Sequence, residues 1–167
     1  MEHPLTKTEI EALFTVDLEG GRLFWRVPSK YHAEKVDQEA GGPALSQSGK
    51  YYWVVSINGR KYKRAHLIFC LAHGRFPVPM ADHKNGDSLD DSPSNLRDAT
   101  ATQNAWNHKK RKRRIALPMG VRATKAGTFE ARIGFHKTQI HLGAFATPEA
   151  AHAVYLSKRS ELYGEFA

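Results

Sequence analysis

The apolar residues of this chain come in short runs that turn-forming residues interrupt, which limits the fold to short strands and short helices. No run approaches the roughly 18 apolar residues that a membrane-spanning helix needs. The length of 167 residues is enough for one ordinary domain or two small ones. We therefore expect an α+β protein built from small sheets and short helices.

The first part of the chain is predicted to be rich in β-structure. Thr8 and Glu11 have the spacing of a capping box, which predicts a short helix near the start. Gly20 and Gly21 lie between two strand-like segments and predict the turn of a hairpin. Residues 28–50 contain Pro, Gly, Ser and charged residues, and they are interpreted as a long irregular connection.

A second hairpin and a buried helix are expected next. Residues 51–57 are rich in aromatic and β-branched side chains, and Asn58 and Gly59 form a type I′ turn signal. Residues 65–72 are apolar enough for a buried helix, and Gly74 is placed to end it. A later capping box, formed by the residues at 100 and 103, predicts a helix that runs into a basic segment.

The last 50 residues predict a separate small unit. Three short strands are expected over 120–122, 128–133 and 138–142. Thr147 followed by Pro148 combines a preferred N-cap with Pro at the first helical position, so a helix should begin there. The unit is therefore predicted to be a three-stranded antiparallel sheet packed on one helix.

The charge is distributed unevenly along the chain. The formal net charge is +8, with 25 Lys and Arg residues against 17 Asp and Glu residues. Residues 82–107 form an acidic island with a net charge of −3, and residues 108–114 carry six bases and no acid. A basic balance points first to a polyanionic partner, although charge used only for solubility remains an open alternative.

The single cysteine, Cys70, excludes an internal disulfide and a cysteine-rich structural zinc site. The first residues lack the pattern of a signal peptide. The expected location is therefore the reducing cytoplasm.

Five polar residues in and just beyond the acidic island have the chemistry of a hydrolytic metal site. Asp82 and Asn104 offer oxygen ligands, and His108 offers an imidazole nitrogen one helical turn from Asn104. His83 is suited to accept a proton from water, and Asn95 to hold that imidazole in place. Such a set can hydrolyse a phosphodiester, because the metal ion neutralises charge while the histidine activates the nucleophile.

The runs Asp82-His83-Lys84-Asn85-Gly86-Asp87, Ser94 to Thr100 and Gln103-Asn104-Ala105 resemble the HNH nucleases, and most closely the phage and homing type with a His-Asn-Asn motif. The resemblance extends from about residue 21 to 107. It implies a ββα-metal unit that grips one divalent ion, with Mg²⁺ or Mn²⁺ as first choices and Zn²⁺ or Ni²⁺ as alternatives.

The resemblance also implies a role for each residue. Asp82 and Asn104 match the metal ligands, His83 the general base, and Asn95 the residue that orients this base. His108 matches a further ligand of some members, and the alternative is that it begins a solvated basic helix end. The other acids of the island are expected to be turn or surface groups: Asp87, Asp90, Asp91 and Asp98.

A second resemblance covers about residues 117–167. The segments 120–122, 129–133, 141–145 and 147–151 are similar, in that order, to the plant ethylene-response-factor (APETALA-type) DNA-binding domain. This implies that the sheet lies in the major groove of DNA, although the plant target sequence does not carry over, because His141 stands where Trp is common.

These resemblances define the predicted domains and DNA contacts. The domains are an HNH nuclease domain at 1–107 with its ββα-metal core at about 78–112, a basic helix end and linker at 108–117, and an APETALA-type domain at 118–167. The residues predicted to bind DNA are Lys109, Lys110, Arg111, Lys112, Arg113, Arg114, Arg122, Lys125, Arg132, Lys137 and His141.

The sequence therefore predicts a metal-dependent DNA endonuclease, encoded by a phage or mobile element and working in the cytoplasm of a bacterial host. Its partner is double-stranded DNA and no membrane, and a monomer and a homodimer both remain open. A DNA-binding regulator with a decayed nuclease unit is the main alternative, and an RNA-binding or ribosome-associated protein is a third.

Overall fold

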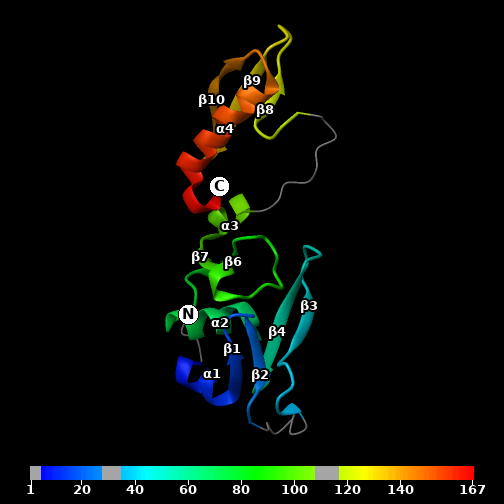
Figure 1. The fold of residues 1–167 in the computed structure, drawn as a ribbon, viewed down its shortest axis with the longest axis vertical. Helices are drawn as coiled ribbons and strands as arrows, with labels where there is room; N and C mark the ends of the chain where they lie inside the picture. The colour runs from blue at the N-terminus through cyan, green and yellow to red at the C-terminus, as the bar shows by residue number, and fades with distance from the viewer. Residues whose placement is uncertain (1–4, 28–34, 108–116) are drawn as a thin grey trace. The chain divides into compact units, whose positions relative to one another are not determined.

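The computed structural model describes residues 5–27, 35–107 and 117–167. Contacts between Cα atoms divide the chain into two compact units, Met1–Asn104 and Ala105–Ala167 (Figure 1). The elements of the first unit are α1 (Lys7–Leu13), β1 (Phe14–Asp17), β2 (Arg22–Trp25), β3 (Gly42–Leu45), β4 (Tyr51–Ile57), β5 (Arg60–Lys63), α2 (Arg64–His73), β6 (Met80–His83), the 3₁₀ helix η2 (Pro93–Asn95) and β7 (Leu96–Ala99). Helix α3 (Ala101–Asn107) crosses the division, and the second unit continues with β8 (Val121–Ala123), β9 (Phe129–Phe135), β10 (Thr138–Phe145), α4 (Pro148–Tyr163) and the 3₁₀ helix η3 (Gly164–Phe166).

The predicted α+β class is confirmed. In the first unit β1 pairs with β2, β6 pairs with β7, and β3, β4 and β5 form a three-stranded sheet, with every pairing antiparallel. In the part of the chain that the structure describes, no helix has both the length and the apolar character needed to cross a membrane.

Two local predictions for the first unit are wrong. The capping box is formed by Thr6 and Glu9, two residues earlier than expected, because the helix that it begins starts at Lys7. The segment expected to be irregular contains strand β3, which pairs with β4. Pro43 is tolerated in β3 because an edge strand forms backbone hydrogen bonds with a neighbouring strand on one side only.

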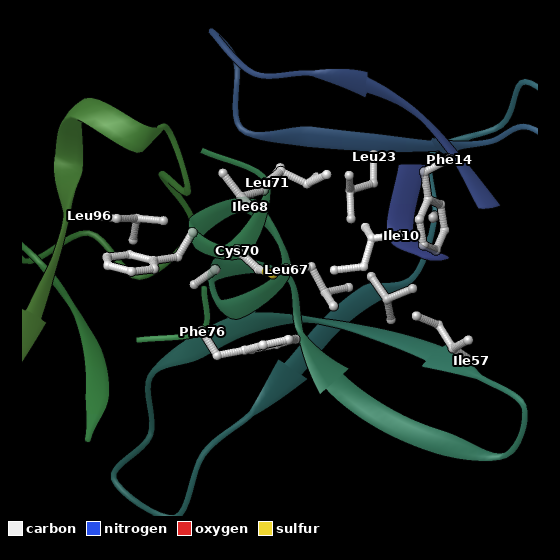
Figure 2. Close-up of a cluster of buried hydrophobic side chains, with 14 of the residues drawn as sticks. Ile10, Phe14, Leu23, Ile57, Leu67, Ile68, Cys70, Leu71, Phe76 and Leu96 are labelled. Atoms are coloured by element: carbon white, nitrogen blue, oxygen red, sulfur yellow. The ribbon is translucent and has the colours of Figure 1, made fainter. Parts of the chain in front are cut away.

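Helix α2 is the centre of the hydrophobic core, as its apolar sequence predicts. Seven of its ten residues are buried, and Gly74 ends it in the left-handed conformation with a φ of 72°. Figure 2 shows side chains of α2 such as Leu67 and Leu71 between those of α1, β1 and β2 on one side and Leu96 of β7 on the other. The β6–β7 hairpin is thereby anchored to the same core as the rest of the unit.

Gly21, in the predicted β1–β2 turn, makes a close approach that no other residue allows. A Cβ at this position would lie 2.3 Å from the backbone carbon of Asp91 and 2.4 Å from the nitrogen of Ser92. Its φ is also +63°, a conformation that glycine adopts without a steric penalty. The turn is therefore packed directly against the segment that precedes η2.

The second unit is a three-stranded antiparallel sheet in the order β10-β9-β8, with α4 packed on it (Figure 1). The predicted helix start is confirmed, since the hydroxyl of Thr147 accepts a bond from the backbone nitrogen of Ala150. The sheet residues that face α4 are apolar and include Ala131, which is fully buried. Trp106, which the sequence prediction left in the first unit, stacks on Tyr163 with ring centroids 4.6 Å apart.

Candidate active site

The β6–β7 hairpin carries Asp82 and His83 side by side in the chain. They are the last two residues of β6, and His83 leads into the loop that precedes η2. Asp82 is 4% exposed and lies opposite Arg97 in the ladder, whose Nε is 2.9 Å from its Oδ2. The carboxylate proposed as a metal ligand is therefore held in a buried ion pair with Arg97.

The imidazole of His83 is held by a carboxylate that the sequence prediction assigned to the surface. Its Nε2 lies 2.8 Å from Oδ1 of Asp91, and only 1% of Asp91 is exposed. The expectation that Asp91 is a turn or surface group is therefore wrong. Asp91 is placed to fix the orientation of the ring, the role that the sequence resemblance gave to Asn95.

Arg64, the first residue of α2, completes this arrangement. Its Nε donates to Oδ2 of Asp91 at 2.7 Å, and its NH1 donates to Oε1 of Glu39 at 2.7 Å. Its guanidinium also lies 4.6 Å from the ring centroid of Trp53. We call the chain Glu39–Arg64–Asp91–His83 the Arg64 network. It places one buried carboxylate between a guanidinium and an imidazole, an arrangement in which every charged group has a partner.

Asn95 stabilises the loop after His83. Its Oδ1 accepts a bond from the backbone nitrogen of Asn85 at 3.0 Å, and its Nδ2 donates to the carbonyl oxygen of Asp90 at 2.7 Å. The hydroxyl of Ser92 donates to Asp90 and lowers the pKa of this carboxyl below its ordinary value. These bonds hold both ends of the loop, so Asn95 acts on the position of Asp91 through the backbone.

Asn104, the second proposed ligand, lies on α3 next to the hairpin. The predicted capping box of this helix is confirmed by a bond of 3.2 Å from the backbone nitrogen of Gln103 to the hydroxyl of Thr100. Nδ2 of Asn104 lies 3.7 Å from the sulfur of Met80. Met80 and Asp82 are two residues apart on β6 and therefore share one face of the hairpin.

The donor set fits a hard divalent ion only in part. Carboxylate and amide oxygens are the ligands that Mg²⁺ and Mn²⁺ prefer, and Asp82 and Asn104 supply one of each. Among the described residues, however, no three His, Cys, Asp or Glu side chains lie together as a metal site. The third predicted ligand, His108, and the basic run from Lys109 to Arg114 lie outside the described residues.

Three of the five predicted DNA-binding residues of the second unit lie on the face of the sheet that points away from α4: Arg122, Arg132 and His141. Arg122 lies opposite Glu130 in the ladder, and His141 lies opposite Arg132. A side-chain oxygen of Glu130 is 2.6 Å from Arg132, which fixes this guanidinium on the sheet surface. Lys125 and Lys137 are exposed in the turns at either end of β9.

Sequence reasoning missed Glu39, Arg64 and Asp91 as site residues. One signal was present for Arg64, because a cation at the first position of an apolar helix faces the positive end of the helix dipole and needs an anionic partner. For Asp91 no local signal existed, since its partners are 8 and 27 residues away.

One known protein gives an independent comparison. The chain is 30% identical over 121 residues to a protein named uncharacterized HNH endonuclease, from Acanthamoeba polyphaga mimivirus. The match covers 71% of this chain and 63% of that protein, so the chain spans less than two thirds of this relative's length. No protein-family model matches the chain, and no solved structure is significantly similar to it. This relative supports the HNH nucleases, and no narrower group, as the family of this chain.

Proposed function

We propose that this chain is a metal-dependent HNH endonuclease that hydrolyses the phosphodiester bonds of double-stranded DNA. The observation that carries the proposal is the orientation of His83 by a buried carboxylate, directly beside Asp82 on the same strand. The His83 side chain is 15% exposed, whereas that of Asp91 is 2% exposed. The ring is thus held by a buried carboxylate and remains partly exposed, as a general base requires.

The proposed chemistry follows from the pairing of His83 with Asp91. A carboxylate can only accept a bond, so Nε2 carries the proton and Nδ1 is left as the acceptor. Nδ1 takes a proton from a water molecule, and the hydroxide attacks phosphorus in line with the 3′ oxygen. The bond from phosphorus to the 3′ oxygen breaks, and this oxygen takes a proton from solvent. The products are a 5′-phosphate and a 3′-hydroxyl.

Asp82 and Asn104 would hold the divalent ion, with His108 as the third proposed ligand. A bound ion would neutralise the negative charge on the phosphate and on the leaving oxygen. The ion pair with Arg97 does not prevent this, because a carboxylate accepts up to about four bonds and Arg97 engages Oδ2 through Nε and NH2.

We assign DNA binding to the second unit as an APETALA-type domain. Three basic side chains on the outer face of its sheet support this: Arg122, Arg132 and His141. Arginine suits bidentate contact with guanine, and Glu130 beside Arg132 suits acceptance from the amino group of cytosine. The basic run from Lys109 to Arg114 is assigned to phosphate contacts, which position an enzyme without reading sequence.

The test is cleavage of supercoiled plasmid by the full chain with Mg²⁺ or Mn²⁺. His83→Ala should lower the rate of nicking by at least about 100-fold, the usual contribution of a general base. His73→Ala is the matched control, because His73 is an exposed histidine of the same unit outside the site. Cleavage by His83→Ala at the parent rate would show that the assignment is wrong.

A DNA-binding protein that does not cut is the second candidate. The observation that favours it is the buried pair of Asp82 with Arg97, which leaves the metal ligand already neutralised. Such a protein should bind duplex DNA equally well with and without a divalent ion and leave the plasmid supercoiled under all metal conditions.

A further inference from the structure

The sheet of β3, β4 and β5 has a concave outer face that none of the assigned roles uses. Its inner face packs on α2 through residues such as Val55, which is fully buried. Its outer face is a groove of about 690 Å³, lined by the sheet and by the segment from Lys35 to Glu39. A groove of this size on an exposed sheet can admit an extended ligand.

The side chains of the groove form a basic surface. Lys61 and Lys63 of β5 lie opposite Ser56 and Val54 in the ladder, so all four share the outer face. Lys35 adds a third cation from the adjoining segment. Within the described residues none of these three lysines forms an ion pair, so their charge is available to a ligand.

The acidic residue of the groove lining offsets one of these three charges. Glu39 is the acid among the described residues that line the groove, and its Oε1 lies 2.7 Å from NH1 of Arg64. Arg64 also pairs with Asp91, so its single charge does not cancel both carboxylates, and the three lysines together with Glu39 give the groove a net charge of about +2.

The remaining lining residues suit a sugar–phosphate backbone. Gly42 and Ala44 of β3 lie opposite β4 and are small, so they allow a strand to approach the sheet closely. Tyr52, whose ring lies 5.5 Å from Nζ of Lys63, and Ser56 provide hydroxyl donors for phosphate oxygens.

We propose that this groove binds the sugar–phosphate backbone of duplex DNA, with Lys61 and Lys63 contacting successive phosphates. The inference rests on the proposed function for its choice of duplex DNA. It adds a contact surface on the first unit itself, separate from the basic run and from the sheet of the second unit.

The test measures binding of the full chain to a 40-bp duplex by fluorescence anisotropy, in EDTA so that no cutting occurs, across a series of KCl concentrations. Each phosphate contact contributes a slope of about −0.9 to the dependence of log K on log salt. The double variant Lys61→Gln/Lys63→Gln should therefore reduce the slope by about 2 and weaken binding on the order of tenfold.

Arg60→Gln is the matched control, because Arg60 lies on the same strand but opposite Ile57, on the side of the sheet that faces the core. It should keep the parent slope. An unchanged slope in the double variant, an equal loss in Arg60→Gln, or a loss confined to single-stranded DNA or RNA would each overturn the proposal. The charges of Lys61, Lys63 and Arg60 are all exposed, so the melting curves of the variants should match that of the parent.

The two proposals fail separately. The nuclease assignment is wrong and the groove assignment stands if the parent cuts no DNA with any metal while the double variant has a shallower salt slope than the parent. If the parent cuts and the slope is unchanged, the groove assignment is wrong and the nuclease stands.

Discussion

Replacing Asp91 with asparagine removes the one negative charge that lies between two cationic or proton-donating groups. The carboxylate accepts a bond of 2.7 Å from Arg64 and one of 2.8 Å from His83. Asparagine has one acceptor oxygen and one amino group, so one of these bonds becomes a contact between two donors. The variant therefore disturbs stability and ring orientation together, and the two effects need separate measurements.

The loss of stability can be bounded from the contacts of Arg64. Removing one partner of a buried ion pair costs about 3–5 kcal/mol. Arg64 keeps Oε1 of Glu39 at 2.7 Å and the carbonyl oxygen of Leu89 at 3.1 Å, so the lower end, about 3 kcal/mol, is expected. With a urea m-value of about 2 kcal/mol/M, the unfolding midpoint of the first unit should fall by about 1.5 M.

The assay is urea unfolding followed by tryptophan fluorescence in a Trp106→Phe background. The remaining tryptophans, Trp25 and Trp53, both lie in the first unit, so the signal reports on that unit. Trp53 contacts the guanidinium of Arg64 and is therefore sensitive to the network itself.

The effect on cleavage is separated from stability by a matched variant. Asp91→Asn should reduce the rate by at least about 100-fold in the absence of urea, because it no longer fixes the tautomer of His83. Arg64→Met should lose comparable stability but keep the bond between His83 and Asp91, so its rate should fall much less. Equal rate losses in the two variants, or a midpoint shift below about 0.3 M for Asp91→Asn, would refute this reasoning.

Two further predictions concern the support of the site. Gly21→Ala should destabilise the first unit by about 2 kcal/mol more than Gly59→Ala, measured by the same unfolding assay: both replace a glycine with φ above +60°, but only Gly21 also meets the backbone of Asp91. Equal losses would show that this packing is unimportant. Asp98→Asn should cost about 1 kcal/mol at pH 7, because Arg75 lowers the pKa of the Asp98 carboxyl through a hydrogen bond. A lowered pKa stabilises the fold above the ordinary value of about 3.9, so the parent and the variant should converge as the pH falls below about 4, and a constant difference would contradict this.

The parts of the fold that were predictable depend on signals within a few residues. The turn at Asn58 and Gly59 has the positive φ values, 49° and 78°, that its type requires. The helix over 65–72 follows from its apolar composition, and the helix start at Thr147 from N-cap chemistry. In each case the residues that determine the turn or helix lie within that element or next to it in the sequence.

The parts that were not predictable depend on contacts between distant segments. Asp90 and Asp91 are adjacent and chemically identical, yet Asp90 caps its own loop while Asp91 is buried against Arg64 and His83. Only the packing of the loop on α2 and on Gly21 decides which of the two faces inward. The sequence resemblance assigned the orientation of His83 to Asn95, whereas the imidazole contacts Asp91, since a motif records residue types without recording their contacts.

The ion pairs of the acidic island change the interpretation of its net charge. Residues 82–107 carry a net charge of −3, which suggests a pocket of free carboxylates waiting for a metal ion. Three of its five acids are instead paired with arginines: Asp82 with Arg97, Asp91 with Arg64, and Asp98 with Arg75. Two of these arginines, Arg64 and Arg75, lie outside the island and reduce its net charge from −3 to −1. A phosphate can therefore approach His83 without strong repulsion, and the basic run need not compensate for the acids.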